Sequence, residues 1–247
     1  MNPAVGIIGK GLVLPVFGFT LGLGYFIKAW PDEAGSMTLQ DSDSSRKKGQ
    51  SNLQLQRHDI VDKITRHGLY QKLINDPNYE HSLQSHKIPP GHRAYHVGQG
   101  VLFGPDKLAI DPLILTNTKK HEVVIFYHLG KDLGNEKGKI HKGVLSLILD
   151  EALCYCGFPT LPSKRGVTAK LDIQFDKDIP ADSTIVLKAR VSEFKGRKCV
   201  IEGTLESLPT VYNSWINALW RPSQYAKAKC ILVEPRWFKY IGWLNVF

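Results

Sequence analysis

The sequence is poor in cysteine and carries no recognisable metal-binding pattern. Four cysteines occur in 247 residues, and their spacing matches neither a zinc site nor a disulfide framework. Histidines gather between His81 and His96, but a Pro-Pro-Gly turn interrupts them and no acidic or thiol ligand joins them. We therefore expect reduced cysteines that pack as small apolar side chains, and no metal site.

Acidic residues are the minority charge. Lys and Arg number 32 against 23 Asp and Glu, which gives a net charge of +9 at pH 7. A basic surface suits a polyanionic ligand or an anionic membrane surface. No RNA- or DNA-binding motif accompanies the charge, so we expect no nucleic-acid partner. The 43% of hydrophobic residues fits one globular domain with appendages.

A single long apolar run lies near the start of the chain, from Val5 to Ile27, interrupted by Lys10. As a helix it would span about 34 Å, enough to cross a bilayer core of about 30 Å. It lacks the Arg-rich amphipathic pattern of a mitochondrial presequence. We predict a transmembrane helix that makes residues 1–30 a membrane anchor; a cleaved targeting segment and a buried apolar hairpin are the alternatives.

The remaining chain divides by composition. Residues 31–54 are polar and predict a flexible tether. Residues 55–96 predict a lead-in of helices and loops, with an amphipathic helix interrupted near Gly68. Residues 97–235 form the predicted main domain, with an insertion rich in Trp, Tyr, Pro and Asn at about 208–225. Residues 236–247 form a C-terminal tail.

The sequence of the main domain predicts several strands, then one long helix, then further strands. Before the helix, strands are expected at about 99–103, 108–115 and 122–129. After it, residues 167–175 alternate between apolar and polar, and Gly196 is placed to turn a hairpin between 184–191 and 198–205. The last strand is expected at 226–233. This order predicts an α+β fold in which an antiparallel sheet wraps around one long buried helix.

The helix, predicted over Val144–Cys156, is apolar on nearly every side, so the carboxylate of Asp150 needs a partner or a function. At the helix start, free N–H groups near Gly143 would attract an oxyanion. Gly143 and Asp150 are seven residues apart, about 10 Å along the axis. A composite site that joins one helix start to the carboxylate of another helix, across a two-fold dimer, is therefore expected.

The pattern His141-Lys142-Gly143, followed by Asp150 nine residues after the histidine, resembles the helix of hotdog-fold acyl-CoA thioesterases of the PaaI-like and thioesterase-superfamily-member type. The likeness covers about residues 97–235. It implies the hotdog fold, hydrolysis of acyl-CoA to free acid and CoA, no cofactor, and a homodimer or higher homo-oligomer. The anchor, the tether and the insertion resemble fungal mitochondrial members, which implies a membrane-associated mitochondrial location.

The resemblance also implies roles for individual residues. Asp150 would be the catalytic carboxylate, acting as base or nucleophile, with Thr168 near the attacking water. The Gly143 N–H would hold the thioester oxygen in a pocket shaped by Asn135 and His141. Lys142 stands where the family usually has glycine, and its side chain is placed to meet a CoA phosphate. Glu151 is the alternative carboxylate, and a non-catalytic acyl-CoA binding or scaffolding module is the alternative function.

Overall fold

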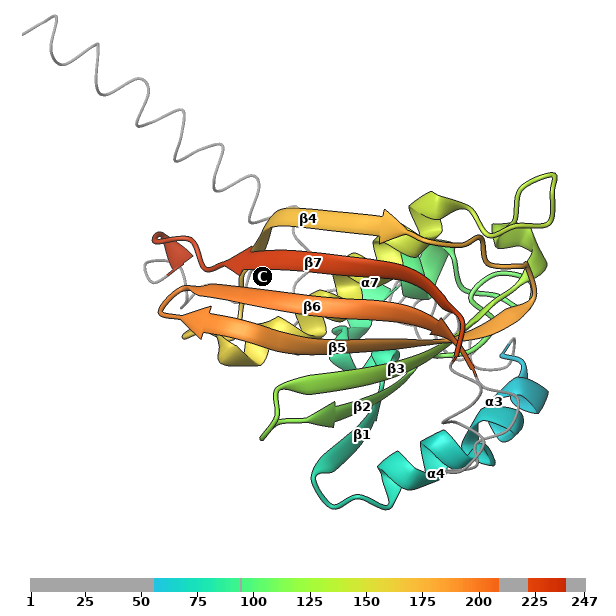
Figure 1. Ribbon diagram of the computed structural model, residues 1–247, viewed down its shortest axis with the longest axis horizontal. Helices are drawn as coiled ribbons and strands as arrows, with labels where there is room; N and C mark the ends of the chain where they lie inside the picture. The colour runs from blue at the N-terminus through green and yellow to red at the C-terminus, as the bar shows by residue number, and fades with distance from the viewer. Residues whose placement is uncertain (1–55, 94, 209–221, 239–247) are drawn as a thin grey trace, which may run out of the picture.

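A curved antiparallel sheet wraps around one long helix in the computed structural model, which describes residues 56–93, 95–208 and 222–238. The helix is α7 (Lys142–Gly157), and the seven strands follow the order β1-β2-β3-β5-β6-β7-β4 (Figure 1). Their bounds are β1 (Tyr79–Leu83), β2 (Leu113–Asn117), β3 (Glu122–Leu129), β4 (Val167–Phe175), β5 (Ser183–Lys195), β6 (Lys198–Ser207) and β7 (Gln224–Val233). The predicted α+β arrangement is confirmed.

Short helices precede the central one. The interruption predicted near Gly68 is present, because α3 (His58–Thr65) ends just before α4 (Gly68–Ile74) begins. The other short helical segments before α7 are α5 (Gln84–Lys87), α6 (Pro90–Arg93), a π-helix (Val97–Val101) and a 3₁₀ turn (Lys131–Leu133). A second 3₁₀ turn (Phe158–Thr160) follows α7. The anchor predicted at 5–27 lies outside the described residues, and no helix within the described ranges is long and apolar enough to cross a membrane.

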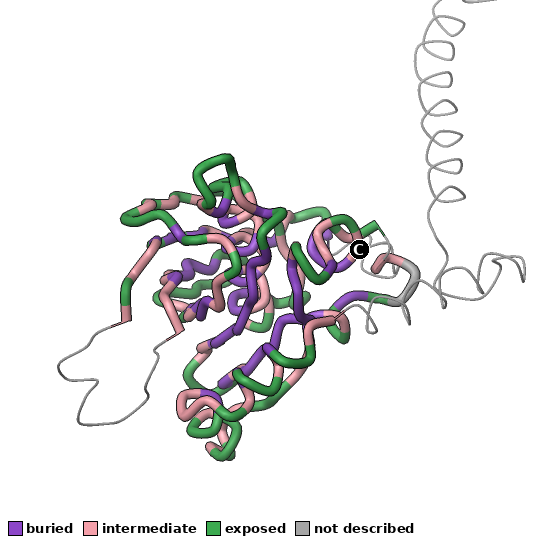
Figure 2. The backbone as a smooth tube through the Cα atoms, turned by 90° about the vertical axis from the view of Figure 1, so that its right-hand side faces the viewer, coloured by how far each residue is buried: buried purple, intermediate pink, exposed green. Residues whose placement is uncertain are grey.

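The sheet separates two hydrophobic cores. Alternate residues of β5 show the division: Ile185 and Leu187 pack towards α7, whereas Val186 packs on the opposite face with Ile64 of α3 and Tyr70 of α4. Each face therefore buries every second side chain of the central strands. In Figure 2 the buried stretches gather in the interior of the molecule, interrupted by intermediate and exposed residues. This double burial explains why β3 is almost wholly apolar.

Three expectations for the chain before the helix were wrong. The strand expected at 108–115 begins only at Leu113, as β2. Most of the strand predicted at 99–103 belongs to the π-helix, and only Phe103 forms an isolated bridge, with Leu108. The Gln99 side chain is buried, and the Gln99 N–H donates to Nδ1 of His96 at 3.2 Å. The lead-in, expected to hold only helices and loops, also contributes β1, which pairs with β2 at the sheet edge. Both segments contain polar residues, so the pattern of apolar residues predicted neither the π-helix nor β1.

Strand β4 lies at the other edge of the sheet and carries a β-bulge between Thr168 and Lys170. The sequence alternation placed Thr168 on the same face as Lys170 and Asp172. The bulge inserts one extra residue and so reverses the alternation of faces. Thr168 therefore faces α7, on the same side as Leu171 and Ile173. The β-bulge thus brings the Thr168 hydroxyl into contact with the Asp150 carboxylate.

Candidate active site

The start of α7 is capped by the side chain before it. Nδ1 of His141 accepts a hydrogen bond from the Gly143 N–H at 3.0 Å, and the His141 carbonyl accepts from Val144 N–H at 3.0 Å. The expectation that the N–H groups of Gly143 and Val144 are free is therefore wrong. The Gly143 N–H meets a ligand only when the imidazole turns away. A Cβ at Gly143 would lie 3.0 Å from Nδ1 of His141, so glycine keeps the imidazole close to the helix.

Asn135 and Lys142 are committed to local contacts around the same helix start. Oδ1 of Asn135 accepts the N–H groups of Lys137 and Lys139 at 3.0 and 3.1 Å, which fixes the turn that leads into α7. Nζ of Lys142 lies 5.3 Å from the ring centroid of Phe175 at the end of β4. This cation–π contact holds the lysine along the edge strand. All three residues at this end, Asn135, His141 and Lys142, are exposed.

Asp150 lies further along α7 and pairs with the edge strand. The Thr168 hydroxyl donates to Oδ1 of Asp150 at 2.9 Å, and Sγ of Cys154 lies 3.6 Å from the same hydroxyl. Asp150 is half-buried and Thr168 is exposed, so water reaches the pair. Burial raises the pKa of Cys154 to about 12, and its thiol therefore stays protonated at neutral pH. The Asp150 carboxylate is therefore the group of this cluster that is chemically able to act as a base or nucleophile.

One chain assembles only part of the predicted site. Asp150 and Thr168 are in contact, whereas Gly143 and His141 belong to the opposite end of the same helix, about 10 Å away along its axis. A substrate carbonyl carbon that contacts Asp150 therefore cannot also reach the N–H groups at the start of the same α7 helix. The described chain brings Asp150 and Thr168 together and leaves Gly143 and His141 apart from them.

Glu151 points away from Asp150 into a buried polar network. Its Oε2 accepts from Nε2 of Gln84 at 2.7 Å, and its Oε1 lies 3.4 Å from Nε2 of His96. The Glu151 side chain is 18% exposed. Burial raises the pKa of Glu151 to about 7, although the Gln84 hydrogen bond opposes the shift. Burial also lowers the pKa of His96, so that both groups are mostly neutral only between the lowered pKa of His96 and about pH 7.

The network continues from Gln84 through two more buried side chains. Nε2 of Gln99 donates to Oε1 of Gln84 at 3.0 Å and to Oδ1 of Asp111 at 2.9 Å. Gln84, Gln99 and Asp111 are all buried. Sequence reasoning missed these partners of Glu151, because they lie far from it in the chain and carry no shared motif. In the described ranges, no group of three or more His, Cys, Asp or Glu side chains is arranged to hold a metal ion.

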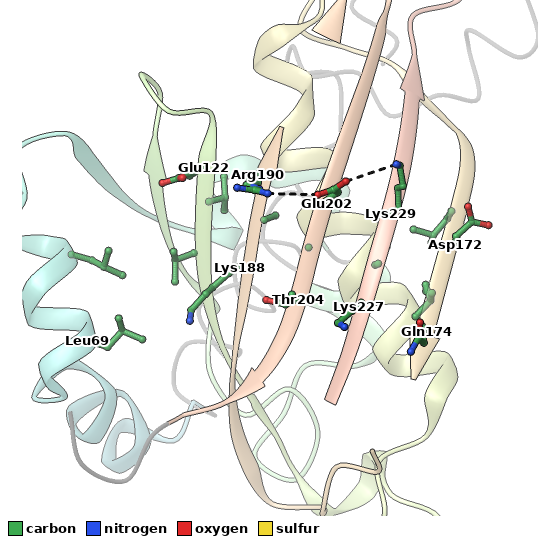
Figure 3. A pocket seen from close by; sticks show the side chains of 18 of the residues that line it. Leu69, Glu122, Asp172, Gln174, Lys188, Arg190, Glu202, Thr204, Lys227 and Lys229 are labelled. Atoms are coloured by element: carbon green, nitrogen blue, oxygen red, sulfur yellow. Dashed lines mark ion pairs between the residues drawn. The ribbon is translucent and has the colours of Figure 1, made fainter. Parts of the chain in front are cut away.

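A large groove lies on the outer face of the sheet, away from α7. Its volume is about 950 Å³, and it runs from Leu69 of α4 across β3, β5, β6 and β7 to β4 (Figure 3). Glu202 stands in its floor between Arg190 and Lys229, each 3.8 Å from a carboxylate oxygen. None of the predicted site residues lines this groove. The groove and the Asp150 cluster are therefore separate features.

Comparisons with known proteins point to one superfamily. The family model described as "Thioesterase superfamily" matches residues 137–211. The Saccharomyces cerevisiae protein named MIOREX complex component 3 is 51% identical over 98% of this chain and 96% of its own length. A Candida albicans protein named only as uncharacterized and mitochondrial is 43% identical over 94% of this chain and 96% of its own. The rat acyl-coenzyme A thioesterase THEM4 is 26% identical over 40% of this chain and 42% of its own.

Proposed function

Because the chain belongs to the thioesterase superfamily, in the fungal branch that contains its yeast and Candida relatives, we propose that it hydrolyses acyl-CoA to free acid and CoA. The observation that carries the proposal is the contact between Asp150 and Thr168, 2.9 Å across the gap between helix and edge strand. A water-accessible carboxylate beside a hydroxyl is what activation of water requires. The name of the more distant rat relative supports acyl-CoA as the substrate class.

In the proposed reaction, Asp150 acts on the thioester carbonyl in one of two ways. As general base it takes a proton from a water held by Thr168, and the hydroxide attacks the carbonyl carbon. As nucleophile it forms an acyl anhydride that water then hydrolyses. In both versions the C–S bond breaks, CoA leaves as thiolate and takes up a proton, and the acid is released. A helix N–H that stabilises the oxyanion contributes about 3–4 kcal/mol per donor.

The oxyanion donor in this proposal comes from a second copy of the chain. The 10 Å between Gly143 and Asp150 on one helix is too long for one carbonyl group. β4 is an edge strand whose first residues, 167–170, are exposed, and such an edge is free to pair with another strand. A homodimer, or a higher homo-oligomer built on it, would place the Gly143 of one protomer near the Asp150 of its partner.

A specific observation keeps a non-catalytic acyl-CoA binding or scaffolding module as the second candidate. The Gly143 N–H is occupied by Nδ1 of His141, and Lys142 stands beside it with a full side chain. If the imidazole never turns away, the thioester binds without oxyanion stabilisation. In either candidate the ammonium group of Lys142 suits a CoA phosphate. Asn135 would shape the same pocket through the turn that it holds.

For the location of the protein we propose mitochondria, with membrane attachment through residues 5–27. The Candida relative is named as mitochondrial, and the apolar run is long enough to cross a bilayer. Carbonate extraction of fungal mitochondria tests this proposal. The full chain is expected in the membrane pellet, and a variant that lacks residues 1–30 is expected in the supernatant.

The activity is tested by measuring CoA release from short-, medium- and long-chain acyl-CoAs by the full chain. Asp150→Asn is expected to lower kcat by about 10³-fold, within the range of general-base contributions. Glu151→Gln, one residue away, is the matched control and should retain most of the activity. An active Asp150→Asn protein would sink the assignment. Binding of acyl-CoA without turnover by the unmodified protein would favour the binding module.

The composite site is tested by mixing two inactive variants. Gly143→Pro removes the N–H donor in the first helical turn, where no intrahelical hydrogen bond of that residue is lost, and Asp150→Asn removes the carboxylate. Random exchange of subunits makes half of the dimers mixed, each with one intact site. About a quarter of the original activity should then return. If no activity returns although exchange is shown by mass spectrometry, the two groups act within one protomer.

A further inference from the structure

The tip of the β5–β6 hairpin concentrates positive charge without an evident benefit to the fold. Lys195 and Lys198 lie directly opposite each other across a two-residue turn, and Arg197 occupies that turn beside Gly196, whose φ is +58°. Like charges directly opposite each other on neighbouring strands destabilise a sheet. All four residues are exposed. The hairpin tip is therefore a place to look for an anionic partner.

Backbone contacts bring more cations to the same end of the sheet. Arg197 exchanges two hydrogen bonds with Glu234 after β7: its carbonyl accepts from the Glu234 N–H, and its guanidinium donates to the Glu234 carbonyl, both at 2.8 Å. The Glu234 carboxylate accepts from the Ser163 N–H at 2.9 Å. The loop before β4 and the chain after β7 thus join the hairpin tip, at the left of Figure 1.

We call this region the basic end. Its cations are Lys164, Arg165, Lys195, Arg197, Lys198 and Arg236. Two carboxylates lie among them; Glu193 is exposed, whereas Glu234 is buried and engaged with Ser163. Cations therefore dominate the surface that a partner meets.

Two aromatic side chains stand exposed at the basic end. Phe194 is 53% exposed and lies edge-on to His121, and Trp237 is 48% exposed. Large apolar side chains at this exposure mark interaction sites when they occur together. Aromatic rings among lysines and arginines are the combination that settles at the headgroup level of a membrane.

We propose that the basic end docks on an anionic membrane surface. Phe194 and Trp237 enter the headgroup region, and the surrounding cations meet lipid phosphates. RNA is the less favoured partner, because RNA-binding sheets present aromatic side chains on a strand face where bases stack. Here Phe194 lies beside a turn and Trp237 lies beyond the last strand. The docking does not depend on the proposed hydrolysis.

Hydrogen exchange on the full chain, reconstituted in vesicles, tests the proposal. The peptide that covers 194–198 is compared in vesicles of phosphatidylcholine alone and in vesicles that also contain phosphatidylserine. We expect slower exchange in the anionic vesicles, and faster exchange again at high salt. Lys195→Gln with Lys198→Gln should lower this protection about 30-fold, since each cation near an anionic surface contributes about a factor of five.

Matched controls make each outcome decisive. Lys63→Gln with Lys72→Gln removes two exposed cations from α3 and α4 and should leave the protection unchanged. Thermal unfolding of both double variants shows that the fold is intact. Equal exchange in neutral and anionic vesicles would overturn the proposal, and so would protection of 194–198 by single-stranded RNA in neutral vesicles that exceeds the protection by anionic lipid.

Discussion

Asp150 and Glu151 are consecutive carboxylates on one helix, yet their surroundings differ in almost every respect. Asp150 is half-buried and receives one hydrogen bond, from the hydroxyl of an exposed threonine on the edge strand. Glu151 is turned about 100° around the helix, where it meets Gln84 and His96. The first carboxylate is open to water. The second is enclosed by the segment between β1 and β2.

The comparison shows why a shifted pKa does not by itself identify the reacting group. Glu151 has the strongly raised pKa, about 7, but its oxygens are held by an amide and an imidazole that are themselves partly or fully buried. Structural networks shift pKa values as catalytic sites do. We interpret Glu151 as the residue that fastens residues 84–101 to α7, and Asp150 as the carboxylate that the proposed hydrolysis uses.

The largest expected effect on stability comes from Glu151→Gln. Because the folded protein holds the Glu151 proton up to about pH 7, whereas an unfolded chain releases it near pH 4.5, ionisation costs stability progressively between these values. The full cost, about 3 kcal/mol, is present above pH 7. Glu151→Gln should raise the free energy of unfolding by up to this amount at pH 8 and change it little at pH 4.

Urea unfolding at a series of pH values measures this difference. His96 works in the opposite direction, because burial lowers its pKa and its protonation at low pH costs stability. That contribution is present in both proteins and largely cancels in the comparison. Equal pH dependence of the two proteins would show that Glu151 is not enclosed as described.

The next effect in size is expected from Gln84→Leu. Gln84 is fully buried and donates to Oε2 of Glu151 at 2.7 Å. Loss of the donor leaves a buried carboxylate less satisfied, which should cost about 2 kcal/mol at pH 8 and less at pH 5, where Glu151 is protonated. In the Glu151→Gln background the cost should shrink by about 1 kcal/mol. A double-mutant cycle measures this coupling. If the effects of Gln84→Leu and Glu151→Gln on stability simply add, the two side chains are not coupled, which would contradict the interpretation of Glu151.

The sequence predicted more of the structure on the Asp150 side of α7 than on the Glu151 side. The apolar helix, the hairpin turn at Gly196 and the strand that carries Thr168 followed from periodicity and turn chemistry. The contact of Thr168 with Asp150 depends on a bulge that alternation does not record. The Glu151 network joins Gln84, His96 and Asp111 through long-range packing. No local pattern predicts such contacts, and the π-helix that holds Gln99 resembled a strand.

On the Asp150 side, Thr168→Val should act on rate more than on stability. Valine keeps the branched shape suited to a strand and removes the hydroxyl, so loss of this positioning contact should lower kcat about tenfold, or about 1.4 kcal/mol. The free energy of unfolding should change by less than about 0.5 kcal/mol, because Thr168 is exposed. Thr168→Ser is the control and should retain the rate. A fully active valine variant would remove Thr168 from the mechanism.

The smallest effect is expected at the start of α7. His141→Ala removes the acceptor of the Gly143 N–H, which should cost about 1 kcal/mol of stability as a lost N-cap. His141→Asn restores a capping oxygen and should recover most of that loss, as urea unfolding will show. If the imidazole only caps the helix, kcat will follow stability and return with asparagine. If it also shapes the oxyanion pocket, asparagine will restore the stability and leave kcat low, which would extend the site from the Asp150 side to the helix start of the partner.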